Sequence, residues 1–173
     1  MPTAIQCPTF RPTLKIGNNG QDVKEMQIRL NLRFASIYTP PLQIPADGDF
    51  GSQTQAAVNF LQCLAFLPVN GIVDATTWNF ICNGATSLPI LKLNSSGNAV
   101  QSVQRALSLS GFYNGAFDGI FGAKTAEAVK VFQTSNRLTS DGVIGTNTWT
   151  ALIKLDTHVE RCYCDYYGGG CEP

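Results

Sequence analysis

The sequence contains six cysteines and one histidine, side chains that are typical of nucleophilic and zinc-binding sites. Four of them stand near the end of the chain as a Cys₃His set of zinc-type ligands: His158, Cys162, Cys164 and Cys171. Their spacing differs from the Cys-x2-Cys of a standard zinc knuckle. Six cysteines in 173 residues also fit a disulfide-stapled protein of an oxidising compartment. We therefore expect disulfides and no bound metal, with zinc at these four ligands as the alternative.

The positions of the cysteines suggest one set of pairs among the fifteen that six cysteines allow. Cys63 and Cys82 fall at the ends of two predicted helices in the first half of the chain, so we expect them to pair. Cys7 would then join a cysteine of the tail, and the other two tail cysteines would pair together. Such bonds would tie the two chain ends together and limit their fraying.

Enzymatic sites find little support in these residues. A single histidine excludes a zinc hydrolase with two or three histidine ligands. A Cys–His pair in the tail would need a full domain to orient it, and residues 155–173 are too few. No pair of acidic residues stands out for glycoside cleavage. We predict a protein that is not an enzyme and that carries no cofactor.

Composition and charge exclude two further classes of function. Hydrophobic residues make up 44% and charged residues 14% of the chain, which is enough to bury a core. Twelve basic side chains balance twelve acidic ones, without the basic stripe of a nucleic-acid binder. No run approaches the roughly 20 apolar residues that span a membrane. Met1–Pro12 also lacks the apolar centre of a signal peptide.

The elements that position these residues come from an internal repeat. Leu14–Val23 matches Leu91–Val100, 77 residues later, and Asp47–Thr54 matches Asp118–Thr125, 71 residues later. The first copy therefore holds six extra residues, which we place in the Pro-rich connection between Phe34 and Ala46.

Each copy predicts three short helices. In the first copy, Val23, Met26 and Leu30 recur at helical spacing over Asp22–Arg33, and Ser52 and Asp74 are expected to cap the next two helices. Asp-Gly and Asn-Gly pairs mark the turns between them. We predict an all-α fold of two tandem three-helix bundles with Gly-rich loops and a cysteine-containing tail. The expected segments are an N-terminal arm (1–13), a first module (14–84), a linker (85–90), a second module (91–154) and the tail (155–173).

Two motifs of the second copy carry a family resemblance. Asp118–Gln133 and Asp141–Leu152 resemble the central and closing signatures of the bacterial peptidoglycan-binding domain family. The likeness covers roughly residues 14–82 and 91–153. It implies a three-helix fold that binds the cell wall through glycan or stem-peptide contacts, usually beside a lytic or peptide-cleaving catalytic domain. No such domain is recognisable in this sequence.

The signature residues themselves read as structural. Phe50, Phe121, Trp78 and Trp149 would seal the small cores. Asp47 and Asp118 would bond loop amides, and Gln62 and Gln133 would satisfy loop backbone groups in the same way. We expect the binding groove among exposed polar and aromatic loop residues, with Arg137 as a forked partner for a stem-peptide carboxylate. The groove candidates are Tyr113, Asn114, Asp118, Asn136, Arg137, Tyr38, Asp47 and Asp49.

The sequence therefore predicts non-catalytic binding of peptidoglycan by two tandem modules that anchor or target the protein to the wall. Tandem copies would gain avidity on a repetitive polymer. We expect an extracellular, periplasmic or wall-associated protein. The alternative is a structural component of a surface layer, phage particle or secretion apparatus that uses the same fold to bind a protein partner.

Overall fold

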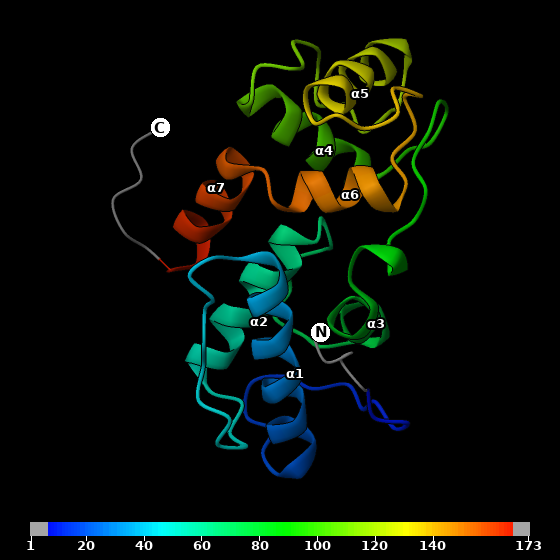
Figure 1. Cartoon of the computed structure of the whole chain (residues 1–173). Helices are drawn as coiled ribbons and strands as arrows, with labels where there is room; N and C mark the ends of the chain where they lie inside the picture. The colour runs from blue at the N-terminus through cyan, green and yellow to red at the C-terminus, as the bar shows by residue number, and fades with distance from the viewer. Residues whose placement is uncertain (1–6, 168–173) are drawn as a thin grey trace. The chain divides into compact units, whose positions relative to one another are not determined.

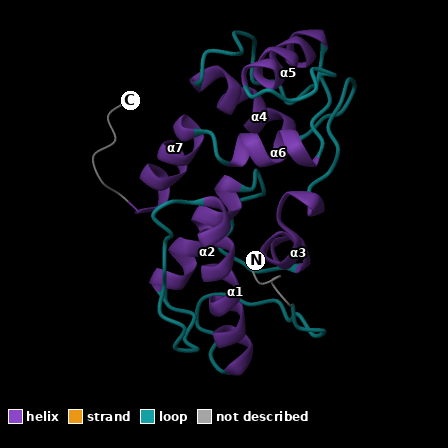
Figure 2. Ribbon diagram, in the orientation of Figure 1, coloured by secondary structure: helices purple, strands orange, loops and turns teal. Residues whose placement is uncertain are grey.

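The computed structural model describes residues 7–167, and within them every regular element is a helix (Figure 2). This confirms the predicted all-α class. The elements are α1 (Gln21–Ile37), α2 (Ser52–Leu64), α3 (Ala75–Asn83), the 3-10 turn η1 (Gly84–Ser87), α4 (Asn98–Leu109), α5 (Ala123–Ser135), α6 (Thr146–Ile153) and α7 (Asp156–Tyr167).

The chain divides into two compact units. One comprises Met1–Ser87 and Cys162–Pro173, and the other comprises Leu88–Arg161. The first holds α1, α2 and α3 and the second holds α4, α5 and α6 (Figure 1). The module bounds predicted from the repeat, 14–84 and 91–154, stay a prediction.

In each unit the apolar face of the helices builds the core. Val23, Met26, Leu30 and Phe34 of α1 are fully buried, as their spacing predicts. Isolated antiparallel bridges join the segment before the first helix to the turn before the third, through Leu14 and Val73 in one unit and Leu91 and Ile144 in the other.

The two tryptophans hold equivalent places in the two units. Trp78 and Trp149 are each 1% exposed, which confirms their predicted role in the core. The indole Nε1 of Trp78 donates to the Pro12 carbonyl at 2.8 Å, and that of Trp149 donates to the Pro89 carbonyl at 2.8 Å. Each indole therefore buries its ring and also fastens the chain segment that enters its unit.

The helix ends differ from expectation at two places. Asp74 caps α3 as predicted, because its side chain accepts from the Thr77 amide at 2.8 Å. The cap of α2 is Gly51, with Ser52 as the first helical residue, so the predicted Ser52 cap is wrong. Helix α1 has 17 residues against 12 in α4, so most of the extra residues of the first copy extend a helix.

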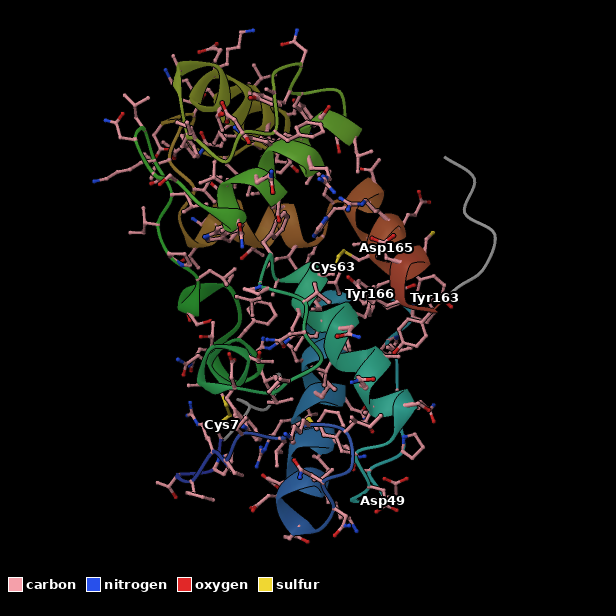
Figure 3. All side chains as sticks on the ribbon, turned by 180° about the vertical axis from the view of Figure 1, so that it is seen from behind. Cys7, Asp49, Cys63, Tyr163, Asp165 and Tyr166 are labelled. Atoms are coloured by element: carbon pink, nitrogen blue, oxygen red, sulfur yellow. A yellow bond between two sulfur atoms is a disulfide. The ribbon has the colours of Figure 1, made fainter. Side chains whose placement is uncertain are left out.

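Residues Asp156–Tyr167 form helix α7, where the sequence predicted only a cysteine-rich extension. Within the first unit, the Cys162 sulfur of α7 is bonded to Cys63 of α2, which is labelled in Figure 3. The Tyr163 and Tyr167 rings meet Phe60 edge-on, with centroids 6.0 and 5.6 Å away. Burial, and next the charge of Tyr163, raise the pKa of Tyr167 to about 12.

The observed disulfides correct the predicted pairing. Cys7 is bonded to Cys82 and Cys63 to Cys162, so the expected Cys63–Cys82 bond does not form. Cys164 is also in a disulfide, and Cys171 lies outside the described residues. The zinc alternative is wrong as well, because Cys162 and Cys164 are in disulfides and the sulfurs of disulfides are not thiolate ligands. Each described bond joins a module to a segment outside the repeat.

Residues 7–167 include no helix that is both long and apolar enough to cross a membrane.

Candidate functional site

A buried glutamine organises the turn before the last helix of the second unit. The Gln133 Nε2 donates to the Asp141 Oδ1 at 2.8 Å, to the Val143 carbonyl at 2.9 Å and to the Thr148 Oγ1 at 3.1 Å. Its Oε1 accepts from the Gly142 amide at 2.9 Å. Gly142 has a φ of 73°, a conformation that favours glycine. From within the core, the carboxamide therefore both donates to and accepts from backbone groups of a tight turn.

The same arrangement occurs four times in the described chain. In each case the carboxamide of a buried glutamine forms hydrogen bonds with an Asp-Gly or Asn-Gly turn. The same carboxamide also donates to the hydroxyl of a threonine six residues after the glycine. The four glutamines are Gln27, Gln62, Gln104 and Gln133. The predicted structural role of Gln62 and Gln133 is confirmed, and Gln27 and Gln104 show that each module is itself built from two helix–turn units.

Asp47 and Asp118, the aspartates of two of these turns, accept hydrogen bonds through one carboxylate oxygen although both residues are exposed. The Asp118 Oδ1 accepts from the Gln104 Nε2 at 2.9 Å and from the Ile120 amide at 2.9 Å. The Asp47 Oδ1 accepts from the Gln27 Nε2 at 3.0 Å and from the Asp49 amide at 2.9 Å. The predicted Asx role of both residues is therefore confirmed, and one oxygen of each carboxylate is already engaged within the turn.

These hydrogen bonds lower the pKa of three carboxyl groups below their usual value. For Asp118 the main cause is the Gln104 side chain, and for Asp47 and Asp141 it is the amide of Asp49 and Val143 respectively. A folded pKa below the unfolded one gives stability that is fully present above the unfolded pKa, near 4, and is lost as the pH falls through the folded pKa.

We expect the free energy of unfolding to be nearly constant from pH 7 to about pH 5 and to fall below about pH 4, as these carboxyls become protonated. Urea unfolding at several pH values measures it. The Asp141→Asn variant is a matched control, because Asn70 holds the same place in the first copy with a neutral side chain. A variant whose stability falls with acid as steeply as that of the parent protein would contradict the assignment for Asp141.

The structure does not gather the predicted groove residues into one site. Tyr113 is 8% exposed, and its hydroxyl donates to the Ala116 carbonyl at 2.8 Å, so the expectation of an exposed aromatic floor there is wrong. Tyr38 is half-buried, with its ring edge-on to Phe60. The other candidates are exposed: Asp47, Asp49, Asn114, Asp118, Asn136 and Arg137.

One of these candidates, Asn136, lines an open pocket of about 530 Å³ in the unit of the second module. That volume falls within the usual range for small-ligand sites. The pocket lies where α5 ends, along α6 and at the beginning of α7. Its lining residues are Asn136, Leu138, Asn147, Thr150, Ala151, Lys154, Leu155 and Asp156.

Sequence reasoning missed most of this pocket. Lys154 and Asp156 flank the junction of α6 and α7, and the tail was not predicted to be helical. Asn147 and Thr150 are exposed on α6, opposite the Trp149 face that defines the core pattern. The available signal was a short polar stripe, Asn147, Thr150 and Lys154, at helical spacing on the outer side of the closing signature.

Comparison with known proteins identifies the fold family. The model of the peptidoglycan binding domain matches residues 19–81 and again residues 96–152. The chain belongs to this family. Each matched segment contains two of the four turns that a buried glutamine stabilises. One match to the family therefore spans two helix–turn units.

Relatives of known name resemble much of the chain. An N-acetylmuramoyl-L-alanine amidase CwlL from Bacillus licheniformis is 35% identical over 82% of this chain and 45% of its own length. A probable N-acetylmuramoyl-L-alanine amidase from the same species is 33% identical with the same coverage. The crystal structure of the SleB N-terminal domain is 36% identical, covering 40% of this chain and 93% of that chain with a TM-score of 0.38.

These relatives correct one prediction. The expectation that the chain is not an enzyme is contradicted by relatives that are themselves named amidases. The chain spans about 45% of the length of the two amidases it matches.

Proposed function

We propose that this chain binds bacterial peptidoglycan, with the open pocket of the second unit as its contact site. Two matches to the peptidoglycan binding domain support the ligand. The pocket supports the place, because amide, hydroxyl and charged groups converge there on a hollow of ligand size. The observation that carries the proposal is the occurrence of this pocket on a module of the family.

An extracellular or wall-associated location fits this function. The bonds of Cys7 with Cys82 and of Cys63 with Cys162 are of the kind that persists in oxidising compartments. We extend the proposal to wall cleavage: binding by this chain serves an N-acetylmuramoyl-L-alanine amidase reaction of the kind for which its relatives are named.

Co-sedimentation of the oxidised protein with insoluble peptidoglycan tests the binding. We expect peptidoglycan to deplete the supernatant, with chitin and cellulose leaving the protein in solution. A protein that remains in the supernatant with all three polymers would contradict wall binding and favour the protein-partner alternative. New free amino groups in the same suspension, against a protein-free control, would mean that this chain catalyses the amidase reaction itself, and their absence would leave it the binding role alone.

A further inference from the structure

The pocket of the second unit holds two opposite charges at its rim. Lys154 follows the last residue of α6 and Asp156 begins α7, and both side chains are exposed. Within residues 7–167, neither side chain forms an ion pair or a hydrogen bond. Both charges are therefore available to a ligand that carries the complementary pair.

The remaining lining groups are amides, a hydroxyl and apolar side chains. The Asn136 Nδ2 donates to the Phe132 carbonyl at 2.9 Å, which fixes the side chain and leaves its oxygen as an acceptor. Asn147 contributes a second amide, and Leu138 and Leu155 supply the apolar surface. The lining includes no aromatic residue, and so no ring on which a sugar could stack.

We infer that this pocket recognises the stem peptide of peptidoglycan rather than its glycan strand. This rests on the proposed function. A stem peptide presents carboxylates, backbone amides and the side-chain amine of a dibasic residue. Lys154 is complementary to the carboxylate and Asp156 to the amine, while the asparagines bond the peptide amides. The glycan strand offers hydroxyls, acetamido groups and, where the stem is absent, the lactyl carboxylate of muramic acid, but it offers no amine to Asp156.

The first module lacks both charges and both asparagines at the equivalent positions, 71 residues earlier. Asn83 stands where the second has Lys154, and Ala85 stands where it has Asp156. Ala65 replaces Asn136, and the fully buried Phe80 replaces Ala151.

The N-terminal arm also reaches the equivalent helix of the first module. The Arg11 Nη1 donates to the Asn79 Oδ1 at 3.1 Å, and Cys7 is bonded to Cys82. Stem-peptide recognition therefore belongs to the second module, and the two copies do not contribute equal sites to avidity.

A competition experiment separates this inference from wall binding itself. The protein is bound to insoluble peptidoglycan, and either a soluble stem tetrapeptide with a dibasic third residue or soluble stem-free glycan strands are added. We expect the peptide to release the protein and the glycan strands to leave it in the pellet. Release by glycan alone would overturn the inference while wall binding stands. Failure of the protein to pellet at all would refute wall binding and the inference with it.

Direct titration of Lys154→Gln with the same peptide, followed by chemical-shift changes, tests the charge contact. We expect affinity to fall by about two- to fivefold, the loss of one solvent-exposed ion pair. Lys124→Gln is the matched control, since it removes the same charge from an exposed position on α5 outside the pocket and should bind as the parent does. Equal affinities of the two variants would overturn the role of Lys154.

Discussion

Loss of the Cys63–Cys162 disulfide is expected to lower the free energy of unfolding by about 4 kcal/mol. The two cysteines are 99 residues apart, so the bond restricts a long loop of the unfolded chain. It also fixes the end of α7 on α2, where Tyr163 and Tyr167 pack against Phe60. The double variant Cys63→Ala with Cys162→Ala removes the bond and leaves no free thiol at these two positions.

Denaturant unfolding of this double variant measures the loss, and limited proteolysis of α7 reports whether the helix stays docked. Thr134→Ala is the matched control, because Thr134 is the residue of the second module equivalent to Cys63 and is exposed. Its effect should stay within about 0.5 kcal/mol. A double variant that unfolds at the same denaturant concentration as the parent would show that the bond adds no stability.

The second large effect is expected at Gln133. Replacement by alanine removes the Nε2 group, whose two N–H donors are shared among three acceptors, and the acceptor of the buried Gly142 amide. Leaving a buried backbone donor unsatisfied costs about 1 to 3 kcal/mol, and the lost side-chain packing adds to it. We expect Gln133→Ala to destabilise the second module by about 2 to 4 kcal/mol.

Gln101→Ala is the control for this variant in the same unit. The Gln101 Nε2 donates to the Phe117 carbonyl at 2.8 Å, but its side chain is exposed, so water can replace it. We expect a change within about 0.5 kcal/mol. Equal losses for both glutamine variants in urea titrations would mean that the turn does not depend on the buried carboxamide.

Helices and turns could be predicted because their causes lie within the repeat. The apolar spacing of α1 and the Asp74 cap are local, and the duplicated Asp-Gly turns show where the helices end. The role of Gln133 followed from its place beside an Asp-Gly turn whose backbone groups its carboxamide could satisfy. The same logic would have reached Gln27 and Gln104 if the half-module repeat had been recognised.

The disulfides and the tail depend on contacts that no local pattern contains. Cys7 and Cys162 lie outside the repeat, so their places on the first module depend on the path of the arm and of α7. Helix α7 carries few core residues of its own and is stabilised where Tyr163 and Tyr167 meet Phe60. Tertiary contacts therefore decide both features, and the sequence alone could only suggest that disulfides form.

Of the predicted groove residues, Asn136 alone lines the pocket. A search for loop aromatics selected Tyr113, whose ring is covered and whose hydroxyl bonds its own loop. The charged rim appears only when α7 is known to begin directly after α6, because this junction brings Lys154 and Asp156 to one edge.

The most direct test of the account blocks the pocket with a bulky side chain and measures wall binding. Asn147 and Thr76 are both exposed second residues of equivalent helices, α6 and α3, and only Asn147 lines the pocket. We predict that Asn147→Trp loses most of its co-sedimentation with peptidoglycan, while Thr76→Trp pellets like the parent protein. Full binding by Asn147→Trp, with both variants folded by circular dichroism, would contradict the assignment of wall binding to this pocket.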